Sequence, residues 1–81
     1  MQNSPRSIYK EMLDLCYYED FPELHQELLT LEETTKRNKG KNKYDIAMQE
    51  IITIIPLFAD SFPEEIFFEI ESLYENYLNE Q

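Results

Sequence analysis

Cys16 and His25 are the side chains of this sequence best suited to act as a nucleophile and a general base. Each is the only residue of its type in the chain. A nucleophilic site places a serine or cysteine beside a histidine that a third group orients. Cys16 and His25 could meet across a helical hairpin. However, His25 is predicted at the edge of a helix face, and no cation near Cys16 would lower the pKa of its thiol. We therefore interpret Cys16 as an inert core thiol and expect no enzyme activity and no catalytic residue.

The inventory for cofactors and metals is equally short. Loops that bind phosphate through backbone amides use several glycines, and Gly40 is the only glycine here. One cysteine and one histidine do not make a zinc site. The Glu-x-x-His pairs of di-iron bundles and an oxygen-rich calcium loop are also missing from the sequence. The sequence predicts no cofactor and no metal.

Apolar residues recur every three or four positions in four separate windows, which predicts helices. Ser4 and Pro5 suit the start of the first helix, as a cap and a first helical residue. Asp20 and Ser61 are expected to cap the second and fourth helices, since a glutamate follows each by three positions. Gly40 is expected to stop the second helix. The predicted helices cover about residues 5–18, 21–37, 44–58 and 62–79.

The third predicted helix, residues 44–58, has the widest apolar face and should be the most buried. Pro56 is expected to kink or end it, because proline removes a helical hydrogen bond. The predicted fold is all-α, a compact four-helix bundle built from two helical hairpins joined by a basic loop. We expect a single domain over residues 1–81.

Charge is distributed unevenly along the chain, whose net charge is −10. Five of the seven basic residues fall within residues 36–43, the basic connector. Residues 11–35 and 44–81 contain acids and no base. Such a field repels nucleic acid and attracts a basic protein partner. The connector could touch phosphate, or it could be a solvated loop that offsets nearby acids.

Phe68 lies on the wrong side of the fourth predicted helix for the core. At 100° per residue it points away from Ile66, Ile70 and the rest of the inward face, which continues to Leu78. An outward aromatic among carboxylates is a suitable anchor for a cationic surface. It could equally be a lone exposed apolar residue or pack on a sister chain. Tyr17, Tyr18 and Leu29 also point away from their helices' inward lines and could extend the surface. The predicted partner-binding residues are Glu64, Phe68, Glu71, Glu75, Tyr17 and Tyr18.

The single cysteine fits a reducing compartment. The N-terminus lacks the features of a signal peptide, and no apolar run approaches the length of a membrane span. We therefore expect a cytoplasmic protein that does not enter a membrane.

In size and charge the chain resembles the short acidic helical proteins with which bacteria and phages neutralise a toxin or a host enzyme. Our first hypothesis is a stoichiometric inhibitor or immunity-type protein that covers a basic surface, such as that of a nuclease. The second is a homo-oligomer or accessory subunit of a larger assembly. The third is a small regulator or adaptor that touches nucleic acid through the basic connector.

Overall fold

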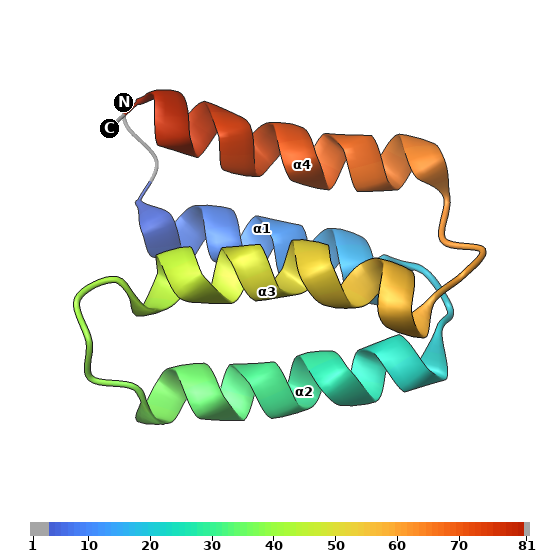
Figure 1. Cartoon of the computed structure of the whole chain (residues 1–81), viewed down its shortest axis with the longest axis horizontal. Helices are drawn as coiled ribbons and strands as arrows, with labels where there is room; N and C mark the ends of the chain where they lie inside the picture. The colour runs from blue at the N-terminus through green and yellow to red at the C-terminus, as the bar shows by residue number, and fades with distance from the viewer. Residues whose placement is uncertain (1–3, 81) are drawn as a thin grey trace.

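The computed structural model describes residues 4–80 and contains four helices. They are α1 (Pro5–Tyr18), α2 (Pro22–Arg37), α3 (Lys43–Phe58) and α4 (Glu64–Asn79), and Figure 1 shows them side by side. Within residues 4–80 there is no strand, so the predicted all-α four-helix bundle is confirmed. Residues 1–3 and 81 lie outside the described residues. The predicted single domain includes all four of them, and the sequence interpreted as lacking a signal peptide includes residues 1–3.

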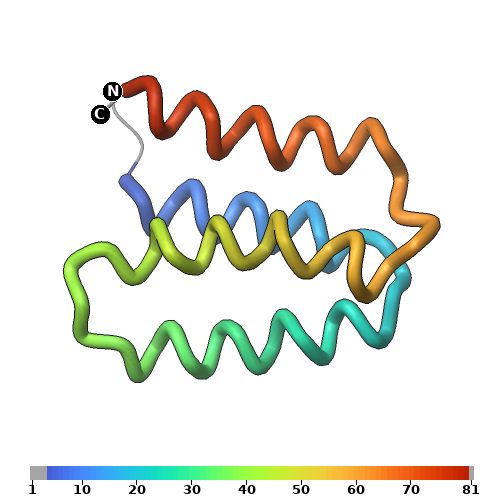
Figure 2. Tube along the Cα trace, viewed as in Figure 1, coloured from blue at the N-terminus to red at the C-terminus, as the bar shows by residue number. Residues whose placement is uncertain are grey.

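Helices α1 and α3 form the centre of the bundle, and α2 and α4 lie on opposite edges (Figures 1 and 2). Helix α2 packs most extensively on α3, and α4 packs most extensively on α1. Helices α2 and α4 do not touch each other. The bundle is therefore flat, with extents of 32 × 28 × 17 Å. One long side of α4 faces no other helix of residues 4–80.

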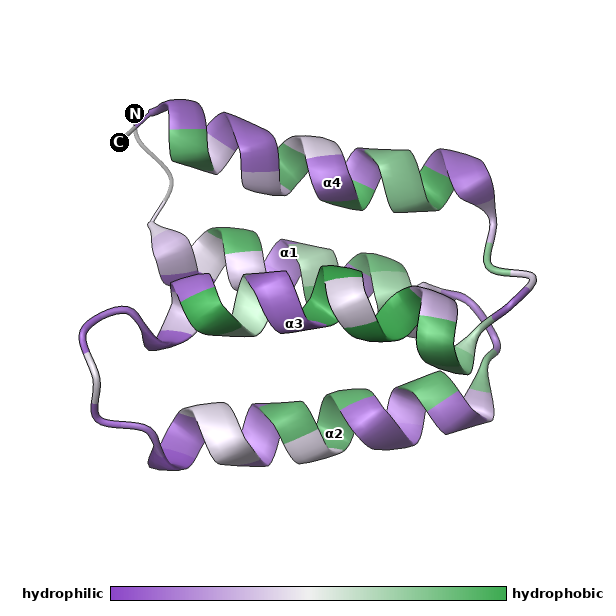
Figure 3. Ribbon diagram, in the orientation of Figure 1, coloured by the Kyte–Doolittle hydropathy of each residue, from purple (hydrophilic) through white to green (hydrophobic). Residues whose placement is uncertain are grey.

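The core draws on all four helices. Helix α3 contributes Met48 and Ile51 with no exposed surface, and it packs against each of the other three helices. In Figure 3, α3 has much of the strongest hydrophobic colour, whereas the segment between α2 and α3 is hydrophilic. Burial of each such aliphatic side chain contributes about 1.5–3 kcal/mol. The other side chains with no exposed surface are Met12, Cys16, Leu24, Leu28 and Ile70.

Of the three predicted helix caps, only the first is present. Ser4 caps α1, since its hydroxyl accepts the backbone N–H of Ser7 at 3.1 Å, as predicted. The predicted caps at Asp20 and Ser61 are wrong. Phe21 and Pro63 occupy the cap positions of α2 and α4, and neither makes a side-chain cap bond. In both turns the chain stays non-helical for longer than the cap pattern implies.

At the ends of α2 and α3, the backbone N–H of the cap residue bonds to a carbonyl of the last helical turn. Helix α2 ends three residues before Gly40, where the Asn38 N–H bonds to the Thr34 carbonyl at 3.0 Å. Gly40 does not have a positive φ, so the predicted glycine stop is wrong. Helix α3 runs through Pro56 and ends two residues later. Pro56 has no N–H to bond to the Ile52 carbonyl, and the helix continues for only two residues beyond it.

Candidate functional site

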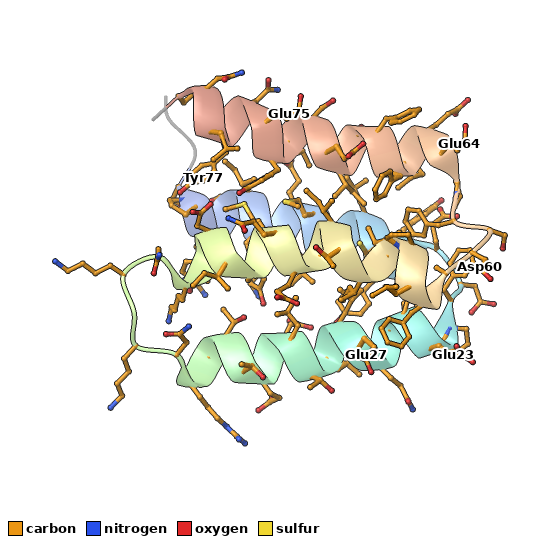
Figure 4. The ribbon with its side chains drawn as sticks, in the orientation of Figure 1. Glu23, Glu27, Asp60, Glu64, Glu75 and Tyr77 are labelled. Carbon is orange, nitrogen blue, oxygen red and sulfur yellow. The ribbon has the colours of Figure 1, made fainter. Side chains whose placement is uncertain are left out.

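Phe68 is exposed to 59% on α4, the helix at the edge of the bundle. Ile70, two residues later, has no exposed surface, and Tyr77 is buried and points toward α1 (Figure 4). The predicted outward direction of Phe68 is confirmed. Leu78 is 44% exposed although we expected it to face inward. Its direction lies at the margin of the apolar face, in the last turn of the helix.

Carboxylates surround Phe68 because α4 is continuous from residue 64 to residue 79. Glu64 lies one turn before Phe68, and Glu71 and Glu75 lie one and two turns after it. Glu64 and Glu75 are exposed, whereas Glu71 is half-buried. In Figure 4, Glu64 and Glu75 lie on the side of α4 that faces away from the other helices. We call these four residues the α4 surface.

Glu65 is a neighbour of Phe68 that the sequence reasoning missed. It precedes Phe68 by three positions, which also brings two residues together on a helix, and its side chain is exposed. Its acidic charge lies on the opposite flank of the ring from Glu64. The α4 helix contains no lysine or arginine, so no cation of its own offsets these charges.

Tyr17 does not point outward, so the expected direction of its side chain is wrong, and its role in partner binding stays a prediction. Its hydroxyl donates a hydrogen bond to the Glu32 carboxylate at 2.5 Å, and its ring lies edge-on to His25 with centroids 5.2 Å apart. These contacts turn the side chain toward α2 and leave it half-buried. Tyr18 is 86% exposed, as expected. Leu29 is also exposed, but it belongs to α2, on the opposite edge of the bundle from α4.

Cys16 and His25 lie close together without forming a nucleophile and a base. The Nε2 atom of His25 is 3.3 Å from the Cys16 backbone carbonyl oxygen, which accepts a hydrogen bond when that nitrogen carries the proton. The Cys16 side chain has no exposed surface, and burial raises the pKa of its thiol to about 12. The predicted core position of Cys16 is confirmed.

No group of three or more histidine, cysteine, aspartate or glutamate residues within residues 4–80 is arranged to hold a metal ion. Likewise, none of the helices in that range has the length and apolar character needed to cross a membrane.

The basic residues gather at one end of the molecule. Helix α1 begins, α2 ends and α3 begins at this end, and the basic connector includes the last residues of α2 and the first of α3. Arg6 and Lys10 of α1 join Lys36 and Lys43 of the connector around one cavity of about 160 Å³. The sequence reasoning grouped only the connector residues. It missed Arg6 and Lys10 because they are distant from the connector along the chain.

The opposite end of the molecule is acidic. It contains the turn between α1 and α2 and the turn between α3 and α4. Glu23, Asp60 and Glu64 lie at this end in Figure 4, and no lysine or arginine occurs in residues 11–35 or 44–81. The fold therefore confines the cations to one end, whereas acidic residues occur at both ends, as Glu75 and Glu64 show in Figure 4.

No protein-family model matches this chain, and comparisons with curated proteins and with solved structures give no match either. A function is therefore inferred from the surface of the molecule alone.

Proposed function

We propose that this protein is a non-enzymatic binding protein that covers a basic surface of a partner protein with its α4 surface. The observation that supports the proposal is the position of Phe68. Its ring is 59% exposed on the edge helix, among carboxylates that no cation of the same helix offsets. Among residues 4–80, no other helix covers the outer side of the α4 surface.

The two kinds of side chain on this surface have different roles in association. A buried aromatic ring near the centre of an interface supplies much of the binding free energy. Carboxylates around it steer a cationic partner and raise the association rate, and they exclude partners with acidic surfaces. The exposed side chains of Glu64 and Glu75 are placed to do this on either side of Phe68. Binding should weaken as salt increases, because salt screens exposed charges.

A partner that handles nucleic acid fits this chemistry. Proteins that bind a phosphate backbone present lysine and arginine clusters, and an acidic helix that covers such a cluster keeps the nucleic acid out. The protein would then act as a stoichiometric inhibitor or immunity-type protein of a toxin or nuclease. Its own net charge of −10 makes the α4 side a poor surface for nucleic acid.

The test begins with capture of the partner from the native host by immobilised protein, followed by measurement of its affinity. Phe68→Ala should weaken binding by more than about 1 kcal/mol, and the fold should remain intact. Leu57→Ala is the matched control, because Leu57 is 69% exposed on α3 and lies outside the α4 surface. An unchanged affinity after Phe68→Ala, or an equal loss in both variants, would remove the proposed site.

The carboxylates are tested with a pair of variants that change the net charge equally. Glu64→Gln with Glu75→Gln should slow association and reduce its salt dependence more than Glu23→Gln with Glu33→Gln, two exposed positions on α2. Light scattering at several concentrations separates self-association from partner binding. A mass that rises with concentration in the wild type and not in Phe68→Ala would assign the surface to a sister chain instead.

A further inference from the structure

We propose that the cavity at the basic end binds the terminal phosphate group of a small anionic ligand. Three helices form the cavity, and no residue of α4 lines it, so the proposal is independent of the α4 surface. Its volume is about 160 Å³. Its lining consists of Arg6, Tyr9 and Lys10 of α1, Glu32, Thr35 and Lys36 of α2, and Lys43 and Tyr44 of α3.

The charge around this cavity is opposite to that of the whole chain. Four cationic side chains and one carboxylate line it, in a protein whose net charge is −10. The carboxylate, Glu32, accepts the hydrogen bond from the Tyr17 hydroxyl. Within residues 4–80, none of the four cations forms an ion pair with a carboxylate. Lys43 instead lies over the Tyr44 ring, with its Nζ atom 5.2 Å from the ring centroid. Their charge is therefore left to act on a ligand.

The cavity also has hydroxyl groups at its inner side. Tyr9 and Thr35 are 4% and 5% exposed, whereas Arg6, Lys10 and Lys36 are exposed. Tyr9 and Thr35 therefore form the inner side of the cavity, and these cations lie at its rim. Burial raises the pKa of Tyr9 above its ordinary value. Tyr9 thus stays protonated at neutral pH and keeps an O–H group that can donate to an anion.

Phosphate is the anion that these groups suit best. A terminal phosphate has a charge of about −1.5 to −2 at pH 7 and three acceptor oxygens, and arginine binds it through two parallel hydrogen bonds. Arg6 supplies such a fork, and Lys10 of α1, Lys36 of α2 and Lys43 of α3 supply further positive charge. A phosphate inside a nucleic-acid chain is substituted on two oxygens, so it could reach the rim but not the inner side formed by Tyr9 and Thr35. This difference favours a small compound with a terminal phosphate.

The first experiment titrates the full chain with pyrophosphate and follows the heat and the backbone amide NMR signals. We expect saturable one-to-one binding, with shifts at Tyr9, Thr35 and Tyr44 and none in residues 64–79. Inorganic phosphate should compete for the same signals. A single-stranded oligonucleotide without a terminal phosphate should not shift them. Binding that does not saturate, or an oligonucleotide that shifts the same amides, would overturn the proposal.

The second experiment compares two double variants with the same change in charge. Arg6→Gln with Lys10→Gln removes two cations that line the cavity, and Lys39→Gln with Lys41→Gln removes two exposed cations that do not. The first pair should weaken pyrophosphate binding at least tenfold, about 1.4 kcal/mol. The second should weaken it less than threefold. Equal losses in both pairs would show a general attraction by the basic end and no site.

Discussion

The Tyr17 hydroxyl and the Glu32 carboxylate are joined by a hydrogen bond of 2.5 Å that links α1 to α2. These two helices make less contact with each other than any other pair of helices that touch. Burial raises the pKa of Tyr17, and the adjacent carboxylate raises it further, so the hydroxyl remains a donor at neutral pH. A polar link therefore supplements a small apolar contact in this hairpin.

Tyr17→Phe should lower the free energy of unfolding by about 1 kcal/mol, because it removes one hydrogen bond to a charged group at a half-buried position. Urea denaturation followed by circular dichroism measures this loss. Tyr18→Phe is the matched control. Tyr18 is 86% exposed, and its replacement should change stability by less than about 0.5 kcal/mol. Equal stability of both variants would mean that the Tyr17 link contributes nothing measurable.

Alkaline pH should destabilise the fold. Burial raises the pKa of Cys16 from 9.0 to about 12 and also raises that of Tyr9, so the unfolded chain releases these protons at lower pH than the folded one. Stability from these groups is complete below about pH 9 and falls as the pH rises toward 12. Each group contributes up to about 1.4 kcal/mol per pH unit in that window. Urea denaturation at pH 8, 9.5 and 11 measures the decline.

Cys16→Ala provides the control for this pH dependence. Alanine costs some packing at every pH, but it removes the thiol titration, so the decline between pH 9 and 11 should be shallower than in the wild type. A wild-type protein that is equally stable at pH 8 and pH 11 would contradict the buried state of these groups.

The helices and their inward faces could be predicted because they depend on short-range spacing. Leu24 and Leu28 are one turn apart and both reach the core, as the spacing indicates. The helix caps at Asp20 and Ser61 could not be predicted in the same way. A cap depends on the backbone angles of the turn, and here Phe21 and Pro63 take the cap positions. The residue pattern alone does not contain that information.

The same distinction applies to the surfaces. The exposure of Phe68 follows from the projection of a single helix, so the sequence was sufficient. Tyr17 turns toward Glu32, a partner on another helix fifteen residues away, and no local pattern signals this contact. Arg6 and Lys36 line the same cavity, and predicting this requires knowledge of how α1 and α2 pack. Sites within one helix were predictable, and sites between helices were not.

Ser4→Ala should lower the free energy of unfolding by about 1 kcal/mol, because it removes the hydroxyl that accepts the Ser7 N–H at the start of α1. Asp20→Ala should change stability by less than about 0.5 kcal/mol, since Asp20 is exposed and does not cap α2. Thermal and urea denaturation of the two variants compare the caps directly. A larger loss from Asp20→Ala than from Ser4→Ala would contradict the structure and support Asp20 as the cap of α2.

Phe68 and Ile70 are two residues apart on α4, and truncating them should change the free energy of unfolding by different amounts. Ile70 has no exposed surface, so Ile70→Val should lower the free energy of unfolding by about 1 kcal/mol through the lost methylene and the space it leaves. Phe68→Ala should change stability by less than about 0.5 kcal/mol although it removes a whole ring, because that ring is 59% exposed. Urea denaturation of both variants measures the contrast. A Phe68→Ala variant that loses more stability than Ile70→Val would place the ring in the core, and the α4 surface would then have no anchor.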